Sequence, residues 1–138
     1  MIRVVADTNV YISAIVFGGT CESVLALARA GIVALFTSGA IRRELRFVLA
    51  GAFGWTETRV REALAEIDVL TTLVQTSVRC SGILVHDEDH RILECAIASQ
   101  ADFLVTGDKK HFQPLKTFQG IRIVSPRQFL DLLRSSEM

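Results

Sequence analysis

Two aspartates directly follow predicted strands, where the ends of parallel strands present side chains to a ligand. Asp7 comes straight after the apolar run Ile2–Ala6 (IRVVA), and Asp108 follows residues 102–106 (DFLVT) by one glycine. Open parallel sheets bind ligands outside the carboxyl ends of their strands. We therefore expect both carboxylates at one edge of the sheet, whatever the order of the strands.

Two further acids can be placed by their angle on predicted helices, taking about 100° per residue. On the helix predicted at 39–50, Glu44 lies on the shoulder of the apolar face. On the helix predicted at 88–100, Asp89 falls near the centre of the buried face, at its N-terminal end. The other acids of that helix are predicted to miss the buried face: Asp87, Glu88 and Glu94.

Carboxylates aimed inward are costly unless something pairs with them. The inward faces of these helices carry no Arg or Lys, so a hard divalent cation, Mg²⁺ or Mn²⁺, is the simplest compensation. Without a cation, the clustered acids would repel one another and raise their pKa values. Each acid also has a simpler alternative: Asp7 and Asp89 can cap helices, and Asp108 is ordinary in a turn. Glu44 has the weakest alternative, because a residue inside a helix cannot cap it.

The elements that must position these acids alternate along the chain. Apolar runs predict strands at Ile2–Ala6, 32–37, 102–106 and Ile121–Val124. Helical patterns are predicted at 9–16, 20–30, 39–50, 56–70, 88–100 and 126–133, whereas 71–86 leaves strand and loop open and 106–110 indicates a turn. Strands alternating with helices indicate parallel βαβ units. We therefore predict an α/β fold: a three-layer α/β/α sandwich with a central parallel sheet.

Local signals and length limit this architecture further. Thr20 is predicted to cap its helix, and Gly31 to end it in the left-handed conformation. Thr56 or Thr58 is predicted to cap the helix that runs to 70. The 138 residues suit one domain with one core, spanning 1–138, with a frayed tail at 134–138.

The composition excludes several classes of protein. Half the residues are hydrophobic and 22% are charged, which is not the pattern of a disordered or fibrous chain. Lys+Arg and Asp+Glu both number 15, so no basic field covers the whole protein. Cys21, Cys80 and Cys95 match no zinc or redox motif. The polar N-terminus and the lack of an 18-residue apolar run predict a soluble, cytoplasmic protein with no membrane segment.

Four segments resemble, in order, the four motifs of the PIN domain: "VVADTNVYIS", Glu44 in "SGAIRREL", "DEDHRILECA" and "FLVTGDKKHF". The ending "IRIVSPRQFLDLL" is similar to the toxin branch of that family in toxin–antitoxin systems, related to VapC-type toxins. The resemblance covers essentially the whole chain. It implies a Rossmann-like sandwich and a Mg²⁺- or Mn²⁺-dependent endoribonuclease that leaves a 5′-phosphate and a 3′-hydroxyl.

The resemblance also implies roles for individual residues. The catalytic, metal-holding set becomes Asp7, Glu44, Asp89 and Asp108. Thr8, Asn9 and Thr106 complete the motifs, and Asn9 is similar to the residue that supports the first acid by hydrogen bonding. The chain departs from the family at His90 and Lys110, where members often carry additional acids. These departures leave the number of bound metals open.

RNA must be held by cations outside the acidic pocket. The candidates are Arg42, Arg43 and Arg46 on the exposed side of the Glu44 helix, and Lys109 and Lys110 beside Asp108. The alternative is a solvated helix face and a solvated turn. We expect the histidines His86, His90 and His111 on the surface or in turns and not as general bases, with His90 the exception to watch because it adjoins Asp89. We expect the aromatic residues Phe47, Phe53 and Trp55 to pack rather than stack a base.

Other functions stay open to different degrees. A phosphoaspartate hydrolase needs an acid where Asn9 stands, and a signalling receiver has no use for Glu44. Within the PIN resemblance, the alternatives are a housekeeping nuclease in RNA processing and a non-catalytic module that binds RNA or protein. A toxin implies a cognate antitoxin as partner, and the apolar composition and the family both suggest a homodimer.

Overall fold

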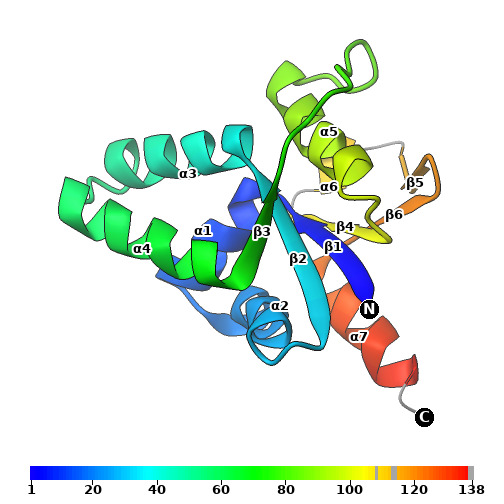
Figure 1. Cartoon of the computed structure of the whole chain (residues 1–138), viewed down its shortest axis with the longest axis horizontal. Helices are drawn as coiled ribbons and strands as arrows, with labels where there is room; N and C mark the ends of the chain where they lie inside the picture. Colours follow the sequence, from blue (N-terminus) through cyan, green and yellow to red (C-terminus); the bar gives the residue numbers. More distant parts are fainter. Residues whose placement is uncertain (108, 113–114, 137–138) are drawn as a thin grey trace.

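The structure, a computed structural model, describes residues 1–107, 109–112 and 115–136. Within these residues, six strands form one sheet in the order β3-β2-β1-β4-β6-β5 (Figure 1). The strands are β1 (Ile2–Ala6), β2 (Val33–Ser38), β3 (Thr71–Val74), β4 (Phe103–Val105), β5 (Thr117–Phe118) and β6 (Ile121–Val124). The pairs β1–β2, β1–β4, β2–β3 and β4–β6 are parallel, and β5–β6 is antiparallel. The predicted α/β fold with a central parallel sheet is confirmed.

Helices cover both faces of this sheet. They are α1 (Thr8–Val16), α2 (Gly19–Arg29), α3 (Gly39–Gly51), α4 (Glu57–Leu70), α5 (His90–Ala98), α6 (Lys109–Phe112) and α7 (Pro126–Ser136), with a 3₁₀ turn, η1 (Asp87–Asp89), before α5. Helix α5 packs against β1 and β2, while α2 contacts β2 and α7 on the other face (Figure 1). The three predicted layers are therefore present.

Strand β1 lies at the centre because its sequence tolerates burial on both faces. Val4, Val5 and Ala6 are fully buried between β2 and β4. Continuous apolar runs of this kind are typical of parallel strands covered by helices on both sides. The strand order reverses at β1, since β2 and β4 lie on its two sides. The carboxyl end of β1 is therefore the point at which doubly wound folds bind their ligands.

Side-chain caps set the start of three of these helices. Asp7 accepts a hydrogen bond from the backbone N–H of Val10, and Thr56 accepts one from that of Arg59. Ser38 caps α3 in the same way. Each cap satisfies a backbone donor that has no acceptor inside its own helix. Thr56, and not Thr58, is therefore the cap of α4.

Several predicted boundaries were wrong. Helix α2 begins at Gly19, so Thr20 lies in its first turn, and the capping position belongs to Gly18 at φ +78°, which glycine adopts at little cost. Only Thr71–Val74 of the ambiguous segment 71–86 forms a strand. Helix α6 replaces part of the predicted turn, and α7 continues to Ser136, past the point where the tail was expected to fray.

Strand β5 was also missed, because Thr117–Phe118 is too short to show an alternating pattern. No single helix in the described ranges is long and apolar enough to cross a membrane. Helices α1 and α2 together reach that composition, but with a bend of 102° between them.

Candidate active site

Asp7 is fixed at the carboxyl end of β1 by the register of the sheet. Ala6 pairs with Val105 of β4, which brings Asp7 and Thr106, the residues that follow these two strands, side by side. The Thr106 hydroxyl donates a hydrogen bond to Asp7 Oδ2, and the backbone N–H of Val10 donates to Oδ1 at 3.1 Å. The Asp7 N–H in turn donates to the Val105 carbonyl at 3.0 Å. Asp7 is only 5% exposed, so its carboxylate has little freedom to move.

Glu44 faces the same strand end from the second turn of α3. The Thr8 hydroxyl donates to Glu44 Oε2 at 3.1 Å, and Thr8 itself is buried directly after Asp7. Glu44 is half-buried, as its angle on the helix predicted. Thr8 therefore links the start of α1 to the acid on α3.

Asp89 closes the 3₁₀ turn at the N-cap position of α5. Its side chain forms no capping hydrogen bond, and its Oδ2 lies 3.2 Å from Nδ1 of His111 on α6. Asp89 thus occupies the N-cap position of α5 without a side-chain capping hydrogen bond, whereas the Asp7 side chain does cap its helix. His111 is half-exposed and connects α6 to the site.

The three acids, called here the acidic site, influence one another electrostatically. Burial raises the pKa of Asp7 to about 6, and the negative charges of Asp89 and Glu44 add to that increase, while its two hydrogen bonds oppose it. Burial likewise raises the pKa of Glu44, with a further contribution from Asp89. In the described part of the chain, neither Asp7 nor Glu44 forms an ion pair with Arg or Lys. The acidic site therefore holds negative charge at a cost to the fold.

The donor chemistry of the acidic site fits a hard divalent cation. Carboxylate oxygens are the ligands that Mg²⁺ and Mn²⁺ prefer, and a cation would remove the mutual repulsion that raises these pKa values. Within the described ranges, no three carboxylate, imidazole or thiol groups lie close enough together to hold one ion. Asp108, the fourth predicted ligand, lies outside the described residues.

One predicted role does not appear in the structure, the support of Asp7 by Asn9. Asn9 is exposed and forms no hydrogen bond with Asp7 among the described residues; Thr106 and the Val10 N–H take that place. Sheet register is the signal that identifies Thr106, and it depends on strands about a hundred residues apart.

The predicted RNA contacts divide into separate groups. Arg42 forms a two-bond ion pair with Asp68, at 2.9 and 3.0 Å, and Arg46 pairs with Glu57 at 2.9 Å. Both pairs tie α3 to α4, so these guanidiniums are already engaged. Arg43 forms no ion pair with the described residues. The side chains of Lys109 and Lys110 lie outside the described part.

His90 is a buried scaffold residue, contrary to the expectation of a surface or turn position. It is 1% exposed, and its Nε2 accepts hydrogen bonds from the N–H groups of Ile83 and Leu84 at 3.2 and 3.0 Å. Its Nδ1–H donates to the Asp87 carbonyl at 3.0 Å. Acceptance at Nε2 goes with donation at Nδ1. His90 thereby anchors the loop before α5.

Glu94 is 4% exposed, so the prediction that it misses the buried face is wrong. Its Oε2 accepts from the Cys80 N–H and from Arg91 Nη2, both at 2.8 Å, and Arg91 also donates to the Cys80 carbonyl. Residues 75–86 cover this side of α5, which a helical pattern alone cannot reveal. Arg91 supplies the inward cation that sequence reasoning did not find.

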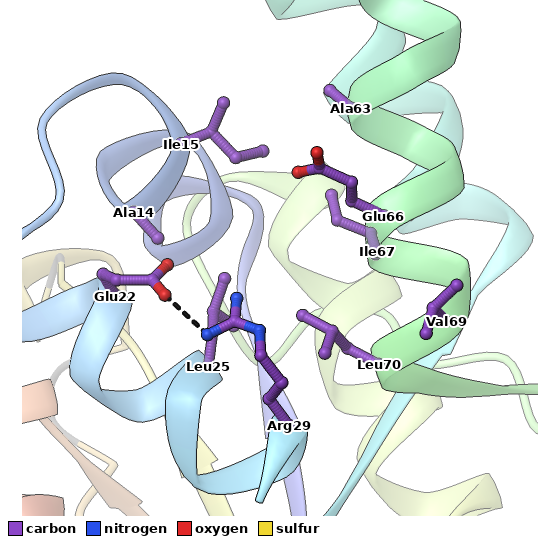
Figure 2. A pocket seen from close by; sticks show the side chains of 10 residues that line it. All are labelled: Ala14, Ile15, Glu22, Leu25, Arg29, Ala63, Glu66, Ile67, Val69 and Leu70. Atoms are coloured by element: carbon purple, nitrogen blue, oxygen red, sulfur yellow. Dashed lines mark hydrogen bonds and ion pairs between the residues drawn. The ribbon is translucent and has the colours of Figure 1, made fainter.

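A separate groove of about 540 Å³ lies between α1, α2 and α4. Its wall is mainly apolar, and Figure 2 shows Leu25, Ile67 and Leu70 along it, with Glu66 nearby. The ion pair between Glu22 and Arg29, at 2.8 Å, lies beside these side chains (Figure 2). None of the residues of the acidic site lines this groove.

The fold and the acidic site together define an α/β protein with carboxylates at the switch point of its sheet. Residues 3–110 match the family model described as the PIN domain, and the chain belongs to the PIN domain family. The family resemblance of the motifs is thus confirmed.

A solved structure shares the fold. It is described as VapBC2 from Rickettsia felis bound to a DNA fragment from its promoter, and it matches at a TM-score of 0.66 with 18% sequence identity. The match covers 90% of this chain and 98% of the other. No curated protein sequence matches the chain.

Proposed function

We propose that this protein is a divalent-metal-dependent endoribonuclease that hydrolyses RNA phosphodiester bonds and serves as the toxin of a toxin–antitoxin system. The observation that carries the proposal is the acidic site: Asp7, Glu44 and Asp89 raise one another's energy, and Asp7 and Glu44 have no cationic side chain paired with them in the described part of the chain. Membership of the PIN family supports the same reading. The proposed place of action is the cytoplasm.

The proposed metal ligands are Asp7, Glu44, Asp89 and Asp108, with Mg²⁺ or Mn²⁺ as the ion. When bound, such an ion lowers the pKa of a coordinated water and neutralises charge on the scissile phosphate. No nucleophilic side chain is required for this hydrolysis. The products expected from the family resemblance are a 5′-phosphate and a 3′-hydroxyl.

The protein's own contribution is to hold the carboxylates in place. Thr106 and the Val10 N–H orient Asp7, Thr8 orients Glu44, and His111 contacts Asp89. Hydrogen-bond partners of this kind fix the direction of ligand oxygens and reduce the motion that would weaken a metal site. Thr8 and Thr106 are therefore proposed as positioning residues.

Purified protein is expected to cut single-stranded RNA in the presence of Mn²⁺ and to lose this activity in EDTA. The physical reason is that the acids alone repel the phosphate, whereas a bound cation attracts it. The measurement is gel analysis of a labelled RNA, with mapping of the product ends. Intact RNA at saturating Mn²⁺ would contradict the proposed nuclease activity and favour the alternative, a non-catalytic module that binds RNA or protein. The energetic cost of keeping these acids buried argues against that alternative.

We further propose a cognate antitoxin as partner. The solved structure with the same fold is described as a VapBC2 complex, and the groove between α1, α2 and α4 offers this chain an apolar contact surface. Glu66 has no ion pair among the described residues, and it lines this groove. An amphipathic antitoxin helix with a basic edge matches both features. A homodimer stays a prediction.

Co-expression with the adjacent small open reading frame is expected to relieve growth arrest and to yield a stable complex. Val69→Arg, at an exposed position lining the groove, is expected to reduce co-purification at least about tenfold, because it places a charge in an apolar contact and repels a basic helix. Val85→Arg, equally exposed elsewhere, is the matched control. If the protein alone does not slow growth and no neighbouring product co-purifies, the housekeeping nuclease replaces the toxin.

A further inference from the structure

A second hollow, of about 310 Å³, lies at the carboxyl ends of β2 and β3 and is lined by three arginines. Its walls come from the end of β2 and start of α3, the end of β3, the loop that follows, and α5. We call it the arginine pocket, after Arg43, Arg79 and Arg91, which share it with Glu94. We propose that the arginine pocket binds a backbone phosphate of the RNA strand, next to the phosphodiester that is cut. This inference rests on the proposed nuclease function.

The charges in the pocket favour an anion. Glu94 is already paired with Arg91 at 2.8 Å, which leaves Arg43 and Arg79 without an ion pair among the described residues. The contrast with Arg42 and Arg46 on the same helix is informative, because both of those are neutralised by carboxylates of α4. The pocket therefore keeps a positive charge that the rest of α3 does not.

Unmet hydrogen-bond donors point to the same ligand. The Nε of Arg91 is buried and has no acceptor among the described residues. Gly39 and Ala40, the first residues of the 13-residue helix α3, also line the pocket, and the N–H groups of a first helical turn have no acceptor inside the helix. Phosphate oxygens accept several hydrogen bonds at once, so a single phosphate group can satisfy donors of both kinds.

Arg43 lies directly over this helix start. Its Nη1 is 3.2 Å from the position that a Cβ would occupy at Gly39. The absence of a side chain at Gly39 therefore lets the guanidinium reach across the first turn. Arg43 and the helix N-terminus thus present their positive charge to the same space.

The position of the arginine pocket indicates that the anion is a phosphate of the RNA strand that is cut at the acidic site. Arg43 precedes Glu44 on α3, and Arg91 follows Asp89 by two residues, so the pocket and the acidic site share their supporting elements. RNA carries a phosphate at every nucleotide, so a strand whose scissile phosphate lies at the acids has neighbouring phosphates within reach. Thr76 and Gln75 add side chains able to hydrogen-bond the ribose.

The test measures binding of a fluorescein-labelled single-stranded RNA by anisotropy in EDTA, over a range of salt, for the full-length protein. Arg43→Gln and Arg79→Gln are each expected to weaken binding about tenfold, because each removes a charge-assisted contact. Each should also make the plot of log K against log salt less steep by about 0.7, the value for one phosphate contact on a single strand. Arg61→Gln, an exposed α4 arginine, is the matched control and is expected to retain both values. Equal affinity and slope in all four proteins would overturn the proposal.

Cleavage kinetics in Mn²⁺ provide a second readout. The pocket variants are expected to raise KM about tenfold with kcat nearly unchanged, because a distant phosphate contact is made equally in the ground and transition states. If the variants cleave and bind like the wild type, this inference fails while the nuclease function stands. If the wild type neither binds nor cleaves RNA, both fail.

Competition identifies the source of the phosphate. Inorganic phosphate and a nucleoside 5′-monophosphate are added as separate competitors of the labelled RNA. Both competitors are expected to displace the RNA only weakly, at millimolar concentration, because the pocket recognises a phosphate that is part of an RNA strand. If the arginine variants lose affinity for the monophosphate but not for RNA, the pocket binds a free nucleotide and the proposal is wrong. Far-UV circular dichroism verifies that each variant is folded.

Discussion

Asp7→Asn is expected to reduce RNA cleavage by at least about 10²–10³-fold, the range for removal of one preorganised electrostatic group, while the fold stays intact. The amide keeps the volume of the carboxylate at the end of β1, and its oxygen can still accept from the Val10 N–H. It removes the negative charge that the proposed cation needs. Initial rates on labelled RNA at saturating Mn²⁺ measure the loss, and circular dichroism measures the fold.

The controls for this prediction separate charge at the site from charge in general. Asp131→Asn changes an exposed acid on α7 and is expected to cleave like the wild type. Thr106→Val removes the hydroxyl that donates to Asp7 and is expected to cost about 10- to 100-fold, as for other partners of metal ligands. Full activity of Asp7→Asn would end the metal-site proposal.

Mn²⁺ is expected to stabilise the protein, by an amount that increases with pH. At a concentration 100-fold above Kd the linkage gain is about 2.7 kcal/mol. For a chain of this length, that corresponds to a rise in Tm on the order of 10 °C. Metal binding requires ionised carboxylates, so the gain should grow as Asp7 and Glu44 lose their protons.

Without metal, the same acids should make the protein less stable as the pH rises. The folded-state pKa of Asp7 is about 6, above its ordinary value of 3.8, so its stabilising contribution is complete below pH 3.8 and is lost as the pH rises through 6. The loss amounts to roughly 3 kcal/mol at 1.36 kcal/mol per pKa unit. Glu44 acts in the same direction.

Thermal melts between pH 4 and pH 8, in EDTA and in Mn²⁺, test both statements. The two curves should separate as the pH rises from about 4 through 6, where the EDTA curve falls and then levels off while Mn²⁺ opposes the fall. Asp7→Asn should flatten the EDTA curve and reduce the response to Mn²⁺. Identical melting temperatures in EDTA and millimolar Mn²⁺ at neutral pH would show that these carboxylates do not form a cation site.

Local patterns predicted the elements well where the physical cause is local. Strands Ile2–Ala6 and Ile121–Val124 match their predicted bounds, because continuous apolar runs of that length suit a buried parallel strand. The helix carrying Glu44 was also predicted closely, since its apolar spacing and the glycines at its ends act within a few residues. Boundaries failed where a neighbour in space decides them, as in the short pairing of β5 with β6.

Of the candidate site, sequence alone determined which residue types are present and toward which sheet edge they are directed. The end of an apolar strand places Asp7, and the helical period places Glu44, because both are properties of the local chain. Asp89 lies in the 3₁₀ turn before α5, so an angle on that helix does not place it. Only the tertiary structure decided their partners. Thr106 meets Asp7 through strand register across 99 positions, and strand register is not encoded in any short segment.

The same limit applies to the charged residues around the site. Helical angle directs Arg42, Arg43 and Arg46 away from the core, yet α4 neutralises two of them and leaves Arg43 free of ion pairs within the described residues. Glu94 and His90 are buried because residues 75–86 fold over α5, which the pattern of α5 does not report. Whether a polar side chain is buried, ion-paired or free to bind a ligand depends on which segments pack against it, and those segments are distant in the sequence.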